Sequence, residues 1–316
     1  MDFSSYRILK SGQCPKAAIT AATSIPTFQI LTVQMIFPSL YTGKQPLQNF
    51  VSTRVGTYYI NSYTPSFILA VFATVLFLLS FLAHTYQVWR YRSWYFTTVP
   101  VALTLEVVGY ICRSLSAHVD PYRLIFFILN YFFIVTAPVL LSAGIYTILS
   151  VMINRVGGQY SPLPPKWILG IFITCDTVAT IVQVSGAALV GSRYSNDEDP
   201  TSANYILLGG LAFQVFTFLV FIVLTTLFLY RCVKDKVVAQ ERKVGVFIAA
   251  FLLATLLVYL RTCFRLAETS QGLEKDLSTH EVYFACLEFA PIAGAVLLFN
   301  IWHPGRCLGR PVHAGL

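Results

Sequence analysis

Charged residues are scarce in this chain of 316 residues. Only 11% of the residues are Asp, Glu, Lys or Arg, whereas 56% are hydrophobic. A typical soluble domain carries about 25% charged residues. So few charges cannot cover the surface of a water-soluble fold of this length. The composition therefore excludes an ordinary soluble enzyme and is typical of a polytopic membrane protein.

The residues and motifs of metal and nucleotide chemistry are also few. The chain has seven cysteines without a C-x-x-C pair and five histidines, of which only His84 falls inside a predicted span. A zinc site needs several ligands that converge on one ion, and a nucleotide site needs a Gly-rich loop that is absent here. We expect no metal, no cofactor, no direct ATP coupling, and cysteines that are mostly buried free thiols.

Long apolar runs predict an all-α fold, a bundle of seven transmembrane helices. Each run is long enough to cross the roughly 30 Å hydrocarbon core of a bilayer, which takes about 20 helical residues. Tryptophans lie at the ends of several runs, as interfacial anchors do. The predicted spans are 66–86, 95–115, 124–150, 167–190, 205–230, 244–265 and 281–302.

Basic residues are more frequent in one set of alternate loops, which predicts the orientation. The richer set comprises Arg90, Arg92, Arg155, Lys166, Arg231, Lys234, Lys236, Arg242, Lys243, Arg306 and Arg310. Cytoplasmic loops gather Lys and Arg, so the C-terminus is expected in the cytoplasm and the N-terminus outside. The same rule accounts for the net charge of +8 without a nucleic-acid partner.

The N-terminal part is the least regular. We expect an extracellular, poorly ordered arm over residues 1–62, a membrane domain over 63–302 and a short cytoplasmic tail over 303–316. The mildly apolar stretch Ala17–Tyr41 is interrupted by Pro26 and Pro38. It is compatible with a disordered arm, an extra span or a secretory leader.

Polar residues inside the spans recur at helical spacing and form stripes. A charged group in a bilayer is costly unless it is paired or hydrated, so each one is a functional hypothesis. Residues three, four or seven apart share one helix face, which here faces the bundle interior. The candidate substrate-binding residues are Glu106, Tyr110, Arg113, Asp176, Gln183, Gln214, Arg261, Arg265, Glu268 and Glu288.

The depth of these residues predicts one shared polar chamber. Most of them fall in the half of the bundle away from the basic loops, with Asp176 and Gln214 near the midplane. Counted with Glu281, five acids face three arginines, an excess of two negative charges suited to an amine headgroup. The alternative is structural: Arg265–Glu268 and Glu106–Arg113 are expected to pair and fix helix register, and the two glutamines to bond between helices.

Several runs resemble the fungal lipid-translocating exporter family, which includes aminocholesterol-resistance and sphingoid long-chain-base resistance proteins. The similarity covers about residues 63–302. Two features depart from the family pattern: Glu288 stands where an aspartate is expected, and residues 1–62 look unlike a short extracellular head. The runs are Tyr63–Ser66, Glu106–Arg113, Ala137-Pro138 with Ala143 and Tyr146, Asp176–Gly186, and Arg261–Arg265 with Glu268 and Gly272.

The resemblance implies a fungal membrane protein that moves, or protects against, amphipathic lipids, and it favours the plasma membrane. Its expected partners are membrane lipids and a cationic amphiphile, such as a sphingoid base or a sterol-like amine. The alternative is a seven-helix receptor or stress sensor, although no Asp-Arg-Tyr or Asn-Pro-x-x-Tyr motif supports G-protein coupling. An intramembrane hydrolase is disfavoured because no histidine accompanies Ser142 or Ser185.

Overall fold

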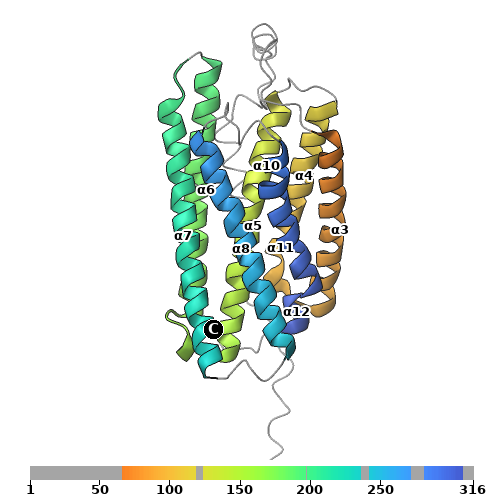
Figure 1. Ribbon diagram of the computed structural model, residues 1–316, viewed down its shortest axis with the longest axis vertical. Helices are drawn as coiled ribbons and strands as arrows, with labels where there is room; N and C mark the ends of the chain where they lie inside the picture. The colour runs from red at the N-terminus through yellow and green to blue at the C-terminus, as the bar shows by residue number, and fades with distance from the viewer. Residues whose placement is uncertain (1–65, 119–123, 197, 236–241, 272–280, 309–316) are drawn as a thin grey trace, which may run out of the picture. The chain divides into compact units, whose positions relative to one another are not determined.

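The structure is a computed structural model. It describes residues 66–118, 124–196, 198–235, 242–271 and 281–308. The predicted N-terminal arm, most of the predicted tail and Gly272 lie outside these ranges. Within them the fold is a bundle of long helices joined by short connections (Figure 1).

Seven helices are long and apolar enough to cross a membrane, which confirms the predicted fold class. Each predicted span coincides with one of them, and most helices extend beyond the predicted bounds because their polar ends continue the helix past the apolar run. The helices are α3 (Phe67–Tyr91), α4 (Thr98–His118), α5 (Leu124–Val156), α6 (Pro165–Ser195), α7 (Thr201–Lys234), α8 (Arg242–Gln271) and a last one built from α10 (Glu281–Tyr283), η4 (Phe284–Phe289) and α11 (Ala290–Ile301). The short elements η2 (Trp94–Phe96), η3 (Gly158–Tyr160) and α12 (Pro304–Cys307) lie in the connections or after the last span.

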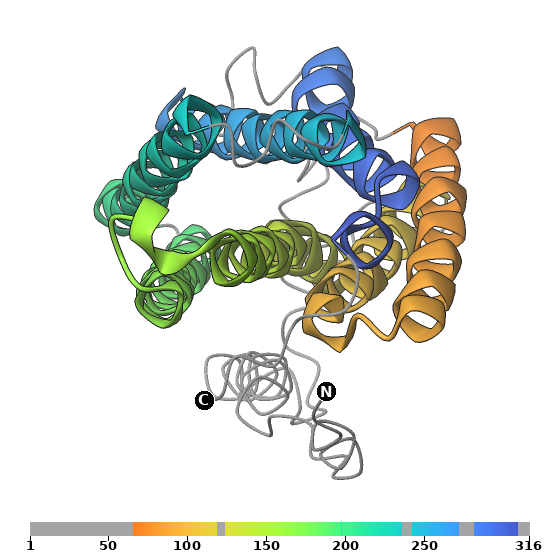
Figure 2. The ribbon, with the colours of Figure 1, turned by 90° about the horizontal axis from the view of Figure 1, so that it is seen from below.

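Helix α5 is the most buried of the seven described spans. In its most apolar window 83% of the residues are buried, compared with 28% for α3. It packs against α4 and α6 and also contacts α8, while α7 lies between α6 and α8 and α11 lies between α8 and α3 (Figure 2). The other helices expose large apolar side chains, which is the expected surface of a protein in lipid.

Two prolines change the backbone of α5 and of the last helix. Pro138 lies inside α5 and has no N–H, so the carbonyl of Ile134, four residues earlier, loses its helical donor. Pro291 follows η4, a π-helical segment in which the N–H of Ala290 donates to the carbonyl of Ala285. Such segments arise where the ordinary ladder is interrupted, and they are frequent at functional sites.

Close helix contacts depend on glycine at two positions. A Cβ at Gly186 of α6 would lie 2.6 Å from the backbone nitrogen of Leu207 in α7. A Cβ at Gly109 of α4 would lie 2.8 Å from a side-chain carbon of Ile134 in α5. Small residues let helix backbones approach closely in membranes.

One minor prediction is corrected, namely that the cysteines are mostly buried. They are free, but of the six in the described ranges Cys112 and Cys232 are buried and Cys286 is exposed. His84, which falls inside a predicted span, is fully buried, and its Nε2 lies 3.3 Å from the carbonyl oxygen of Val296 in α11. The burial of these side chains follows from which helix faces meet, which hydropathy alone does not specify.

Candidate functional site

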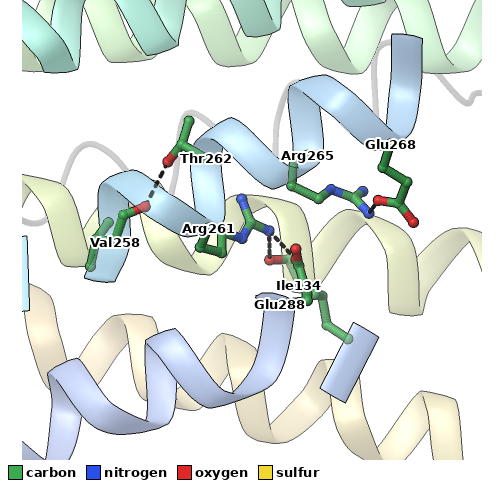
Figure 3. A network of polar contacts seen from close by, with 7 residues as sticks. All are labelled: Ile134, Val258, Arg261, Thr262, Arg265, Glu268 and Glu288. Carbon is green, nitrogen blue, oxygen red and sulfur yellow. Dashed lines mark hydrogen bonds and ion pairs between the residues drawn. The ribbon is translucent and has the colours of Figure 1, made fainter. Parts of the chain in front are cut away.

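A buried ion pair joins α8 to η4. Arg261 and Glu288 form an ion pair at 2.5 Å with both side chains almost fully buried (Figure 3). The same Nη2 atom of Arg261 donates to the carbonyl of Ile134 at 3.0 Å. This is the carbonyl that Pro138 leaves without a helical donor, so one guanidinium links three helices by replacing a missing N–H.

Further charged and polar residues extend this contact into a larger set, here named the outer cluster. Glu106 and Tyr110 of α4 interact electrostatically with both Arg261 and Glu288. The guanidinium of Arg113 lies 3.9 Å from the centre of the Phe284 ring, a cation–π contact. The outer cluster comprises Glu106, Tyr110, Arg113, Arg261, Arg265, Glu268 and Glu288.

One of the two expected ion pairs is confirmed. Arg265 donates to Glu268 at 2.7 Å, three residues further along α8 (Figure 3). The expected pairing of Glu106 with Arg113 is not what the contacts indicate, because Glu106 interacts with Arg261 and Glu288 from other helices. Spacing along one helix could not anticipate these partners.

The outer cluster has no excess of acid when its described members are ionised. Glu106, Glu268 and Glu288 are balanced by Arg113, Arg261 and Arg265. The predicted excess of two negative charges counted Asp176, which lies elsewhere, and Glu281, whose side chain is outside the described part. The described part of this cluster is therefore electrically balanced, and the predicted acidic excess stays a prediction.

A second polar site lies between α5 and α6. Asp176 is 3% exposed, and its Oδ2 accepts a hydrogen bond from the hydroxyl of Tyr146 at 2.8 Å. Its Oδ1 is buried and has no hydrogen-bond partner among the described residues. Thr180 donates to the main-chain carbonyl of Asp176, one helical turn away. Asp176 is thus a buried acid without a basic partner in the described part of the chain.

Aromatic rings surround Tyr146, the hydrogen-bond partner of Asp176. The Tyr146 ring lies 4.5 Å from that of Phe221 and 5.5 Å from that of Phe172, measured between ring centres. Phe218 contacts the same group. We name Asp176, Tyr146 and these three phenylalanines the midplane site. It offers one polar contact within an apolar, aromatic wall.

The two glutamines bond to each other between α6 and α7. Gln183 Nε2 donates to Gln214 Oε1 at 2.8 Å and lies 3.3 Å from the carbonyl of Gly210. A Cβ at Gly210 would lie 2.9 Å from the Gln183 side chain, so the glycine makes room for this contact. These contacts confirm the prediction that the two glutamines form a hydrogen bond between helices.

The predicted single chamber divides into two regions. The outer cluster reaches α5 at Ile134, whereas Asp176 reaches it at Tyr146. Twelve residues of helix separate the two, or roughly 18 Å at 1.5 Å per residue. The structure brings together the candidates of α4, α8 and η4, and it places Asp176 apart from them along α5, while Gln183 and Gln214 bond to each other between α6 and α7.

Several residues of these sites or in contact with them were not among the candidates. Tyr146 donates a hydrogen bond, the carbonyl of Ile134 accepts one, and Phe284 offers its ring face to Arg113. Helical periodicity does not single out any of them. The role of Ile134 could have been predicted from Pro138, because a proline inside a span leaves the carbonyl four residues earlier without its helical donor. An arginine on a neighbouring helix is a suitable donor.

In the described chain, seven apolar helices whose central parts bury their charged side chains define a polytopic integral membrane protein. Residues 99–311 match the family model described as "RTA1 like protein". The chain belongs to this family.

Curated relatives of the chain are fungal. It is 30% identical to "Sphingoid long-chain base transporter RSB1" of Saccharomyces cerevisiae, over 70% of this chain and 67% of the relative. It is 27% identical to "Lipid-translocating exporter-like protein RTA1" of Leptosphaeria maculans, over 82% of this chain and 53% of the relative. It is 28% identical to "Probable lipid transporter atnI" of Emericella nidulans, over 80% and 69%. No solved structure matches the chain.

Proposed function

We propose that this protein moves amphipathic lipids across a membrane, and that its substrates carry an amine headgroup, as sphingoid bases and sterol-like amines do. The names of its relatives support lipid transport. The observation that carries the substrate class is Asp176, a buried carboxylate with an unbonded oxygen and no basic partner in the described chain. An ammonium group is the partner such a carboxylate lacks.

The midplane site supplies the contacts that this substrate needs. Asp176 would bind the ammonium group, the Tyr146 hydroxyl would orient the carboxylate, and the phenylalanines would contact the apolar part of the lipid. Binding energy then comes from one desolvated charge pair and a large apolar area. A neutral lipid of equal length would lose the charge contact and leave Asp176 unpaired.

The outer cluster has a different proposed role. Its balanced charges disfavour it as the primary amine contact, so we propose that it lines the far end of the lipid path and holds α4, α5, α8 and η4 in register. Its substrate-binding candidates would meet the headgroup only after Asp176 releases it. Gln183 and Gln214 would close α6 on α7 beside the path.

We also propose a plasma-membrane location with the N-terminus outside and the C-terminus inside, and resistance to toxic amphiphiles as the cellular result. The Lys/Arg-rich loops support the orientation. Accessibility of tags at the two termini to protease in intact cells tests it: cleavage of the N-terminal tag alone is expected, and cleavage of the C-terminal tag alone would reverse it.

Flux of a fluorescent sphingoid base from liposomes with purified protein tests the transport proposal. We compare wild type, Asp176→Asn, Asp199→Asn and protein-free liposomes. Asp199 is a matched control because it is an exposed acid outside the spans. Wild type and Asp199→Asn should transport the amine, whereas Asp176→Asn should lose at least tenfold, the equivalent of about 1.4 kcal/mol.

The outcomes separate the two parts of the proposal. Equal flux from wild type and protein-free liposomes would end the transport proposal and leave ligand sensing as the better reading. Flux above the protein-free level that is unchanged in Asp176→Asn would keep transport and end the role of Asp176. A neutral lipid analogue transported as fast as the amine would end the charge-selection argument.

A further inference from the structure

A surface hollow of about 470 Å³ lies at the Lys/Arg-rich end of the bundle. It is lined by Gln159 and Tyr160 of η3 and by Arg231, Lys234 and Asp235 at the end of α7. Figure 2 shows the bundle from this end, with the α5–α6 connection beside α7, and η3 contacts α7. The volume is that of a small-ligand pocket, about 300–1,000 Å³. The proposed lipid path does not use this hollow.

The hollow has the side-chain chemistry of a phosphate site. Arg231 and Lys234 are three residues apart and so share one face of α7. Both are exposed, and neither forms an ion pair with another described residue. Guanidinium and ammonium groups bind phosphate oxygens through charge-assisted hydrogen bonds, and the Gln159 amide and Tyr160 hydroxyl add neutral donors.

The remaining residue that lines the hollow is an aspartate, which lowers the net positive charge of the lining. Asp235 ends α7, and its N–H bonds to the carbonyls of Arg231 and Val233. Its carboxylate reduces the charge of the two cations to a net +1. A headgroup with one net negative charge matches this set better than a polyanion does.

An apolar stripe continues from the hollow along α7. Val223, Leu227, Tyr230 and Lys234 are spaced four, three and four residues apart, so they lie on one face. Val223, Leu227 and Tyr230 are exposed large side chains. These apolar residues lie closer to the bilayer midplane than the two cations do. A lipid whose phosphate contacts the cations could therefore lay an acyl chain along them.

The hollow also lies at the depth of lipid headgroups. Helix α7 has 34 residues, or about 51 Å at 1.5 Å per residue. The hydrocarbon core is only about 30 Å thick, so the last turns of α7 extend into the headgroup layer. Trp89, Trp94 and Trp167 are exposed at this same end, as interfacial residues are.

We propose that this hollow binds an anionic phospholipid of the leaflet at the Lys/Arg-rich end. Arg231 and Lys234 hold its phosphate, Gln159 and Tyr160 donate to the headgroup, and one acyl chain lies along Val223, Leu227 and Tyr230. The lipid is a bound ligand rather than the transported substrate, because the hollow opens at the surface and lies apart from the midplane site.

Ligand-induced shifts of the unfolding temperature in detergent test this site. Full-length protein is titrated with short-chain phosphatidylserine, phosphatidylcholine of equal chain length, or inorganic phosphate. Wild type is compared with Arg231→Ala/Lys234→Ala and with Arg90→Ala/Arg306→Ala, which removes two exposed arginines at the same end but outside the hollow. The hollow variant should bind phosphatidylserine roughly thirtyfold more weakly, at about 1 kcal/mol per cation.

The matched control should bind like wild type, and phosphatidylcholine should bind more weakly than phosphatidylserine to both. Equal losses in the two double variants, or none in either, would overturn the site. Equal stabilisation by inorganic phosphate would overturn the lipid assignment and leave a free-phosphate site. Asp235→Asn supplies a change of opposite sign: it should tighten phosphatidylserine binding, and a weakening would contradict the proposed charge balance.

Discussion

The outer cluster and the midplane site are two ways of burying charge in the same bundle. In the outer cluster three acids lie among three arginines, and Arg261 bonds both to Glu288 and to the carbonyl of Ile134. At the midplane, the Asp176 side chain accepts a hydrogen bond from a tyrosine hydroxyl and has one oxygen without a partner among the described residues. The first region places each acid near an arginine, although Glu288 Oε2 and Arg261 Nε also lack hydrogen-bond partners in the described chain, whereas the second leaves one acid without a basic partner there.

This difference assigns different roles to residues that look alike in the sequence. A compensated ion pair holds helices in place and has little left to offer a ligand. An uncompensated acid destabilises the protein alone and binds a cation when one arrives. Glu288 and Asp176 are both acids on interior stripes, and only the tertiary contacts distinguish them.

The largest effect is expected from breaking the outer cluster. Arg261→Ala leaves Glu288 buried without its cation and the Ile134 carbonyl without a donor. We expect a loss of about 3–5 kcal/mol, seen as a lower unfolding temperature or as loss of monodisperse protein. Glu268→Ala, which breaks a more exposed pair, should cost less than about 1 kcal/mol.

A compensating variant keeps this prediction testable if the single variant does not fold. Arg261→Met/Glu288→Leu removes both charges and keeps the volume, so it should recover most of the lost stability. Equal instability of the double and single variants would show that the pair is not the source of the effect. Transport is a separate measurement: because the proposed lipid path ends at this cluster, the double variant should keep most of its stability and transport the amine more slowly than wild type.

An intermediate effect is expected at the midplane. Tyr146→Phe removes the hydroxyl that Asp176 accepts from and keeps the aromatic contacts. The lost hydrogen bond to a buried acid should cost about 1–3 kcal/mol, and amine transport should weaken because the carboxylate is no longer oriented. Chemical denaturation and the liposome flux assay measure the two effects. Normal stability with normal transport would remove Tyr146 from the site.

The smallest effect concerns Asp199, an acid outside the membrane. The hydroxyl of Thr201 and then its backbone N–H bond to the Asp199 carboxylate and lower its pKa below the ordinary 3.8. Because the folded-state pKa is depressed, the stabilisation is present above the unfolded-state pKa and is lost as the pH falls through the folded-state pKa. Full exposure keeps it small.

Unfolding temperatures of wild type and Asp199→Asn, measured against pH, test this. Wild type should be slightly more stable at neutral pH, and the difference should disappear under acid conditions. A difference that stays constant down to the lowest pH would show that the carboxylate charge is not responsible.

Features of the fold that depend on a single helix could be predicted from the sequence. Seven spans, their approximate bounds and the interior stripes all come from local hydropathy and helical period, and the structure confirms seven spanning helices. The Arg265–Glu268 pair was predicted for the same reason, since both residues lie on one helix. Contacts between helices were predicted less well: Glu106 interacts with α8 and η4 rather than pairing as expected.

The chain by itself determined that this is a seven-helix membrane protein whose charges inside the spans face the bundle interior, because the bilayer requires long apolar helices and penalises every unpaired charge within it. Only the tertiary structure decided which charges compensate one another. Among the described residues, Arg261 meets Glu288 and the carbonyl freed by Pro138, while the Asp176 side chain accepts its hydrogen bond from Tyr146. The reason is geometric: helical period fixes the face on which a side chain lies, whereas its partner depends on how neighbouring helices are rotated and shifted against that face.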